Sequence, residues 1–189
     1  MLTPQLSELI TALQALTPMP DDDTLNDLPV EDNPMDTLDN ILIALKQETR
    51  ETYPLEIIPP LLEVFGTGTG NGVFWGILHL VEAYPDKQEL YPLIQRATRS
   101  TNPGTREWCC LLLGRRRNLA DEPFLVERLQ DPVAVVRQYA LKGIIMLSQC
   151  YSMTHLLPLI EPLLHDEDKE VRHTATNALE ALRRSPDEE

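Results

Sequence analysis

The chain reads LQDPVAVVRQYA at residues 129–140 and LHDEDKEVRHTA at residues 164–175, so one pattern occurs twice at an interval of 35 residues. Leu, Asp, Val-Arg and Ala recur at matching positions, and Ile144 matches Leu179 further along. A repeat of this length is the sequence signature of stacked supersecondary units, each of which buries its apolar face against its neighbours. The repeat therefore decides the fold prediction.

Weaker copies of the pattern lie upstream. Each copy has a small residue followed four positions later by a large apolar one, in the pairs Gly76/Leu80, Cys109/Leu113, Ala140/Ile144 and Ala175/Leu179. Residues four apart lie on the same face of a helix. The small residue lets a second helix approach and the large one fills the next gap, so the pattern predicts packed helices.

Helix-end signals agree with this prediction. Asp131 is followed by Pro132, an N-cap residue before a proline at the first helical position, and Asn102-Pro103 repeats the arrangement. Asp168 is placed to cap the last helix. We expect antiparallel helical hairpins and no strands, with helices near residues 3–16, 36–49, 54–65, 72–84, 87–99, 103–116, 121–130, 133–149, 152–165 and 168–184.

The pattern Leu-x-Asp-x-x-x-x-Val-Arg-x-x-Ala resembles the HEAT-repeat family. The resemblance is specific over residues 120–184, moderate over 87–119 and poor before 86. It implies an all-α fold, a short right-handed α-solenoid of about five HEAT-like helical hairpins. It also implies a single domain over residues 1–189, with recognisable repeats at 71–184 and an atypical N-terminal cap at 1–70.

The same resemblance implies structural roles for the charged residues of the motif. In HEAT proteins the aspartate commonly caps the second helix of a repeat, and the arginine bonds to a neighbouring repeat. Carried onto the matching positions, this implies structural roles for Asp131, Asp166, Arg106, Arg137 and Arg172.

Two segments are predicted to lie outside helices. Residues 17–35 contain four prolines and six acidic residues without a single base, and we expect a mobile acidic loop that takes part in an interaction. Residues 66–72 are glycine-rich, but they follow no strand and lack a Lys-Ser/Thr ending. They are predicted to form a helix–helix loop rather than a phosphate-binding loop.

Charge is distributed unevenly along the chain. The net charge is −14, and residues 1–95 hold three Lys/Arg against 16 Asp/Glu. Such a surface repels nucleic acid and anionic membranes and speeds the encounter with a basic partner. The alternative is that the acidity serves solubility alone. We expect a cytoplasmic protein, since no long apolar run or signal-peptide pattern is present and the three cysteines suggest reduced thiols.

No catalytic motif emerges from the sequence. Iron-binding hydroxylases of HEAT type carry paired His-Glu dipeptides, and none of the four histidines here precedes Glu. His165, Asp166, Asp168 and His173 cluster in sequence, but both aspartates have predicted capping roles. Arg115-Arg116-Arg117 is the only basic run, which argues against nucleic-acid binding. We predict no catalytic residue, no metal and no cofactor.

An aromatic column is the most informative candidate site. Trp75, Trp108 and Tyr139 each precede the small residue of an aligned repeat. In a HEAT stack the second helices line the concave side, where aromatic residues supply rigid contact area for a partner. Filling gaps between adjacent repeats is the competing interpretation.

These observations predict a non-catalytic protein-binding adaptor or inhibitor with a basic protein partner. The sharper form is an immunity protein that neutralises a basic toxin or effector. An enzyme or ligand-binding protein of HEAT type, similar to the phycobilin lyases, is the alternative. The predicted partner-binding residues are Trp75, Trp108, Tyr139, Lys142, Asp21, Asp22, Asp23 and Asp27.

Overall fold

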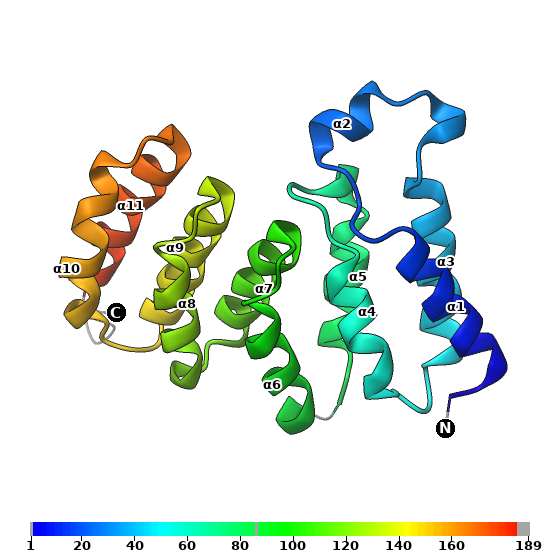
Figure 1. Cartoon of the computed structure of the whole chain (residues 1–189). Coiled ribbons are helices and arrows are strands. Elements are labelled where there is room, and N and C mark those ends of the chain that lie inside the picture. The colour runs from blue at the N-terminus through cyan, green and yellow to red at the C-terminus, as the bar shows by residue number, and fades with distance from the viewer. Residues whose placement is uncertain (1, 86, 185–189) are drawn as a thin grey trace. The chain divides into compact units, whose positions relative to one another are not determined.

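The computed structural model describes residues 2–85 and 87–184, and all regular structure within them is helical (Figure 1). This confirms the all-α prediction. The longer helices are α1 (Pro4–Ala15), α3 (Met35–Glu48), α5 (Phe74–Glu82), α6 (Lys87–Ala97), α7 (Pro103–Arg116), α9 (Ala134–Ser148) and α11 (Lys169–Arg183). The shorter ones are α2 (Asp22–Asp27), α4 (Ile58–Glu63), α8 (Glu122–Arg128) and α10 (Leu157–Ile160).

Short 3-10 turns connect or extend these helices. They are η1 (Val30–Asp32), η2 (Leu55–Ile57), η3 (Gly70–Gly72), η4 (Leu119–Asp121), η5 (Thr154–Leu156) and η6 (Glu161–His165). The single helix predicted over residues 152–165 is wrong in detail, because η5, α10 and η6 divide it. Pro158 and Pro162 lie inside this stretch. Proline has no amide hydrogen to donate and therefore interrupts a regular helix.

The chain divides into two compact units, Met1–Thr105 and Arg106–Glu189, and the boundary falls inside α7. In the first unit α1 packs on α3 and α4, α3 packs on α5, and α4 contacts both α5 and α6. Its core is apolar and includes the edge-to-face pair Phe65–Phe74, whose ring centroids are 5.5 Å apart. The assembly of all hairpins into one right-handed solenoid, and one domain, stays a prediction.

In the second unit, α9 is the central helix. α8 and α11 both pack on it, and α10 and η6 pack on α11. A glycine pair allows α7 and α9 to approach closely: a Cβ atom at Gly114 would lie 2.5 Å from the Cα atom of Gly143. The interior is lined by Leu112, Val136, Ile144 and other fully buried side chains.

Two buried ion pairs connect successive elements of the second unit, and they carry the Asp and Arg of the repeated motif. Arg106 donates from Nε and Nη2 to the two carboxylate oxygens of Asp131, at 2.8 and 2.9 Å. Arg137 binds Asp166 in the same bidentate manner, at 2.8 and 2.7 Å. These four residues are therefore structural, and the two arginines make the long-range bonds that the resemblance implied. The predicted capping by Asp131 and Asp166 is wrong, because the N-cap residues are Val133 for α9, without a side-chain bond, and Asp168 for α11.

The aspartates of these pairs also organise the chain before the next helix. The carboxylate of Asp131 accepts from the Val133 amide, and that of Asp166 accepts from the Asp168 amide. Burial would raise the pKa of Asp131, but its bonds to Arg106 and Val133 and the charges of Arg106 and Arg128 hold that pKa below 3.8. Each motif aspartate thus acts both as a turn former and as an anion between repeats.

Candidate protein-interaction surfaces

The acidic segment between α1 and α3 contains α2 and η1, which corrects the prediction of a loop over residues 17–35; its mobility stays a prediction. Met19 and Leu25 are buried in the first unit, and α2 and η1 lie within the segment. The Asp21 carboxylate caps α2 by accepting from the Thr24 amide at 2.8 Å. Hydrogen bonding to Thr24, chiefly to its backbone amide, lowers the pKa of Asp21. Asp21 is therefore a capping residue as well as an exposed acid.

Asp22 is held by the glycine-rich loop. Its carboxylate accepts from the amides of Thr69 and Gly70, at 2.8 and 2.7 Å, and from the Thr69 hydroxyl at 3.0 Å. Gly68, with φ of 98°, leaves room for it, since a Cβ atom there would lie 2.6 Å from Asp22 Cγ. The predicted helix–helix loop is confirmed, but its amides bind a carboxylate of the same chain. Asp22 is thereby committed to an internal contact.

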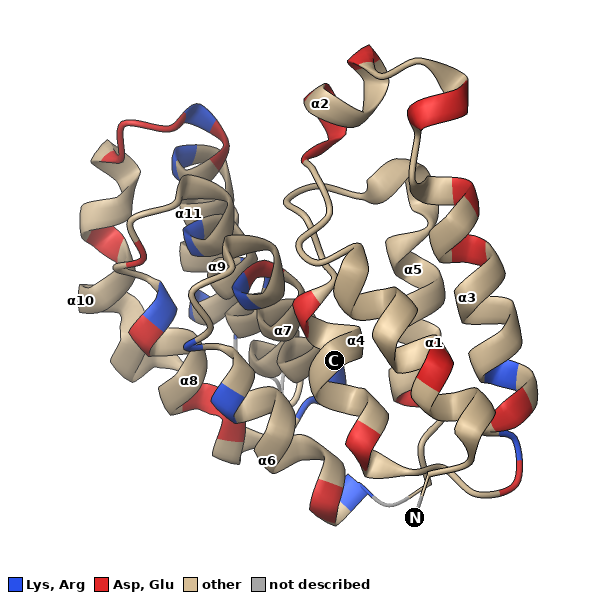
Figure 2. Ribbon diagram, turned by 45° about the vertical axis from the view of Figure 1, so that its right-hand side comes forward, with Lys and Arg blue, Asp and Glu red and all other residues tan. Residues whose placement is uncertain are grey.

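The remaining acids of this region form one exposed surface, which we call the acidic surface: Asp21, Asp23, Asp27, Glu31, Asp32, Asp36 and Asp39. They lie on α2, η1 and the start of α3, where Figure 2 shows red ribbon without blue. Residues 1–45 contain no Lys or Arg. The field of these carboxylates is therefore not offset by any cation on the same stretch of chain.

A hollow with a mixed lining opens beside the acidic surface. It has a volume of about 280 Å³ and lies where α2, η1, η3 and the start of α3 meet. Four apolar and four polar residues line it: Leu25, Leu28, Val30, Met35, Asn26, Asn33, Asn71 and Asp36. Val30 is 84% exposed. Such a lining next to carboxylates suits a partner that offers an apolar side chain next to hydrogen-bonding groups and Lys or Arg.

The three residues of the aromatic column differ in how far they are exposed to solvent. Trp108 is completely buried, which corrects its prediction as a partner contact; it is a core residue of α7. Trp75 of α5 lies in the first unit and is 38% exposed, with its ring centroid 6.5 Å from that of His79. Of the two tryptophans, only Trp75 presents an accessible indole.

Tyr139 and Lys142 contact each other on α9 in the second unit. The Lys142 ammonium lies 4.0 Å from the centroid of the half-buried Tyr139 ring, a cation–π distance. Burial lowers the pKa of Lys142, while the charges of Glu107 and Glu170 oppose the effect. The pair is partly accessible, and its role in binding a partner stays a prediction.

The candidates for chemistry among the described residues are the clustered histidines and aspartates and the buried cysteines. No cluster of three or more His, Cys, Asp or Glu side chains there is placed to hold a metal ion. Of the cluster noted in the sequence, Asp166 binds Arg137 and Asp168 caps α11 through the amides of Glu170 and Val171. Cys109 and Cys110 are buried, and burial strongly raises the pKa of the Cys110 thiol. No helix in the described part of the chain is long and apolar enough to cross a membrane.

Comparison with known families supports the repeat assignment at the C-terminal end. Residues 156–182 match the family model described as HEAT repeat. This stretch covers α10, η6 and most of α11. A search of curated protein sequences gave no match. HEAT repeats commonly build helical scaffolds for protein interaction, so the coarse functional class suggested by the repeat is a protein-interaction scaffold.

The sequence identified the acidic residues but did not indicate which of them bond within the chain and which remain exposed. The hollow at Leu25 and the contact between Asp22 and Thr69 depend on segments 45 or more residues apart, and no local pattern signals them. The glycine run at residues 66–72 did signal an unusual backbone, since Gly68, Gly70 and Gly72 all have positive φ. The glycine run did not indicate that the amides of this backbone bind the carboxylate of Asp22.

Proposed function

We propose that this chain is a non-catalytic adaptor or inhibitor that binds a basic protein partner through the acidic surface of its first unit. The observation that carries the proposal is the row of exposed carboxylates from Asp21 to Asp39, unbroken by any Lys or Arg and bordered by a partly apolar hollow. Carboxylates of one sign on a rigid support accelerate association with a cationic protein.

The hollow supplies what charge alone does not. Exposed ion pairs contribute little net binding energy because they remain solvated. A side chain that enters the hollow contacts Leu25, Leu28 and Val30, and we expect this contact to contribute more to the affinity than the exposed carboxylates. In this proposal, the carboxylates set the rate and orientation of docking, and the hollow sets the lifetime of the complex.

The sharper form of the proposal is an immunity protein whose partner is a basic toxin or effector domain. An inhibitor of this kind needs a preformed surface and no chemistry of its own. The acidic surface meets the first requirement because α2 is pinned by the Asp21 cap and by the bonds from Asp22 to the glycine-rich loop. Little ordering free energy is then lost when the partner docks.

The test is capture from native extract, followed by association kinetics with the captured partner. The double variant Asp23→Lys/Asp27→Lys reverses two acids that make no capping bond, and Glu51→Lys/Glu89→Lys is a control with the same charge change outside the acidic surface. We expect the first variant to slow association by tenfold or more at low salt, on the order of steering effects in other complexes. The control should associate at nearly the wild-type rate.

Three results would contradict the proposal. Equal association rates for both variants would remove the acidic surface from binding. A neutral or acidic partner would remove the charge argument. A coloured preparation that carries a tetrapyrrole would favour the ligand-binding alternative. For the immunity form, the captured partner must be a toxin or effector whose activity the wild-type chain suppresses.

A further inference from the structure

The hollow beside the acidic surface has room for a side chain rather than for a small-molecule ligand. Its volume of about 280 Å³ lies below the roughly 300–1,000 Å³ of most small-molecule sites. The hollow is formed entirely within the first unit, by α2, η1, η3 and the start of α3. A partner that docks on the acidic surface can therefore place one anchoring side chain in it, and the lining indicates which kind.

Two of the polar residues in the lining are held by bonds within the chain. Asn33 uses both ends of its amide: Nδ2 donates to the carbonyl oxygen of Leu25 at 3.3 Å, and Oδ1 accepts from the Met35 amide at 3.0 Å. Asn71 donates from Nδ2 to Oδ1 of Asn26 at 3.4 Å. These bonds determine which polar groups of the hollow are left for a partner.

The groups left for a partner are mostly hydrogen-bond acceptors. Within the described part of the chain, the Asp36 carboxylate makes no hydrogen bond or ion pair, and Oδ1 of Asn71 accepts no hydrogen bond. Nδ2 of Asn26 is a side-chain donor without a bond there. An ionised carboxylate can only accept, and its bonds are strongest with a charged donor. The open oxygens therefore favour a cation that carries several N–H groups.

The apolar part of the lining favours a cation with an aliphatic stem. Leu25 is buried at the base of α2, and Val30 is 84% exposed beside it in the lining. Arginine lays three methylene groups along an apolar wall and ends in a planar guanidinium with five donors. That group is also more weakly hydrated than the ammonium of lysine. One arginine can thus supply the apolar contact and the donors together.

We propose that the hollow recognises one arginine side chain of the basic partner, with its stem against Leu25 and Val30 and its guanidinium bonded to the Asp36 carboxylate and to Oδ1 of Asn71. This inference rests on the proposed function for its partner. It makes a separate claim, because Asp23 and Asp27, the acids that test the proposed function, do not line the hollow.

The wall that carries Asn71 is fixed before a partner arrives. Asn71 lies in η3, and the two residues before it, Thr69 and Gly70, donate their amides to the Asp22 carboxylate at 2.8 and 2.7 Å. These bonds tie η3 to α2, so two sides of the hollow are connected. A preformed site loses little conformational entropy when the arginine enters.

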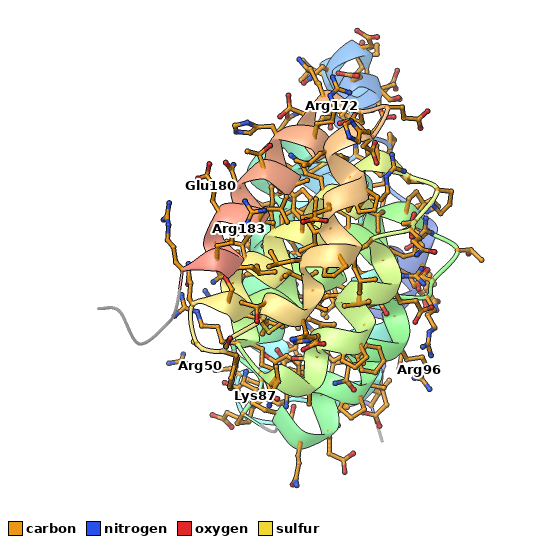
Figure 3. The ribbon with its side chains drawn as sticks, turned by 90° about the vertical axis from the view of Figure 1, so that its left-hand side faces the viewer. Arg50, Lys87, Arg96, Arg172, Glu180 and Arg183 are labelled. Carbon is orange, nitrogen blue, oxygen red and sulfur yellow. The ribbon has the colours of Figure 1, made fainter. Side chains whose placement is uncertain are left out.

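A second copy of this chain is the other source of an arginine. Figure 3 labels Arg50, Arg96 and Arg183, all of which are exposed. Each copy has a net charge of −14, and residues 1–45 hold no Lys or Arg, so repulsion between like charges opposes the approach of one copy to the acidic surface of another. A basic protein is attracted by the same surface. We therefore assign the arginine to the basic partner and test the second copy directly.

The test titrates capped amino acids into the isotope-labelled full chain and follows its amide signals by NMR. Nα-acetyl-arginine methylamide should produce saturable shifts of the Asn71 side-chain amide and the Val30 backbone amide. The capped citrulline has nearly the same shape without the charge. Capped citrulline, lysine and leucine should bind roughly tenfold more weakly than arginine, because each loses charged hydrogen bonds or apolar contact.

Matched variants locate the binding site of the arginine probe. Asp36→Asn should weaken its binding roughly tenfold. Asp39→Asn removes the same charge from the same helix outside the hollow and should leave the affinity nearly unchanged. Asn71→Gly removes the second acceptor and should also weaken binding. Glycine adopts the φ of 50° at this position freely, so the loop backbone is retained.

The outcomes separate this inference from the proposed function. Equal binding of the arginine and citrulline probes, or equal effects of Asp36→Asn and Asp39→Asn, would overturn the arginine site, whereas slower association of Asp23→Lys/Asp27→Lys would still support the proposed function. Arginine binding at the hollow, together with a captured partner that is insensitive to Asp23 and Asp27, would refute the proposed function alone.

The source of the arginine is decided by two measurements. With the captured partner, Asp36→Asn should raise the dissociation rate roughly tenfold relative to Asp39→Asn, and equal rates would overturn the assignment to that partner. Light scattering of the full chain tests the second copy. A monomer agrees with the assignment, whereas a dimer that Asp36→Asn dissociates would show that a second copy occupies the hollow and would overturn it.

Discussion

Replacing Arg137 by alanine should be among the most damaging single changes in the second unit. The side chain is 9% exposed and makes three strong bonds, two to the Asp166 carboxylate and one to the Asp131 carbonyl oxygen. Truncation leaves the Asp166 carboxylate, itself 7% exposed, with the hydrogen bond from the Asp168 amide as its remaining bond among the described residues. It also leaves the Asp131 carbonyl oxygen without this donor.

The expected loss of unfolding free energy follows from the Asp166 carboxylate, which remains buried after the substitution. Removing one partner of a buried ion pair costs about 3–5 kcal/mol, because the other charge stays away from water without compensation. With a urea m-value of about 1–3 kcal/mol per molar, the midpoint should fall by roughly 1–5 M. Arg172→Ala is the matched comparison, since its exposed guanidinium should contribute less than about 1 kcal/mol.

The ion pair between Arg137 and Asp166 also predicts how the loss of stability in Arg137→Ala varies with pH. The hydrogen bonds from Arg137 hold the pKa of Asp166 below 3.8, despite the opposing effect of burial. A carboxylate with a lowered folded pKa stabilises the fold above its unfolded pKa, and this contribution disappears as the pH falls through the folded value. The difference between wild type and Arg137→Ala should therefore be full near neutral pH and shrink below about pH 4.

Fluorescence can report on the second unit alone. The chain has two tryptophans, and Trp75→Phe leaves the buried Trp108 as the only indole. Urea titrations of Arg137→Ala and Arg172→Ala in this background, at neutral and acidic pH, give the required comparison. A loss below about 1 kcal/mol for Arg137→Ala, or equal losses for the two arginines, would refute the reasoning about burial.

Three further changes test other contacts. Gly114→Ala should destabilise the second unit by about 1–3 kcal/mol, because the added methyl group would clash with Gly143. This loss is expected despite the better helix propensity of alanine. An unchanged urea midpoint would contradict the close approach of the two helices. Asp22→Ala should speed hydrogen exchange of the Thr69 amide, and unchanged protection would show that the contact does not hold the loop. A thiol reagent should modify about one cysteine per native chain, Cys150, because the other two are buried; two or three fast equivalents would contradict that packing.

The sequence by itself determined the longer helices and the repeated pattern, but not α2 or the division of residues 152–165 into short helical turns. The spacing of Ala140 and Ile144, and of Ala175 and Leu179, lies within single helices, and both predicted helices appear with bounds within two residues of those expected. Local signals succeed here because a helix bonds mainly to itself. The structural role of Arg137 was implied by the resemblance to HEAT repeats, whereas the predicted N-cap role of Asp131 was wrong, because α9 begins at Ala134 after Val133.

Only the tertiary structure decided which candidate residues are accessible. Trp75 and Trp108 occupy the same sequence position in their repeats, yet one is 38% exposed and the other fully buried. Arg137 and Arg172 share one motif, but among the residues that the structure describes only Arg137 forms an ion pair with a carboxylate. In the sequence Asp22 is one of several acids, whereas in the structure its carboxylate accepts a hydrogen bond from the Gly70 amide of the glycine-rich loop. In each case the outcome depends on what packs over the residue, and burial is a property of distant segments brought together rather than of neighbours along the chain.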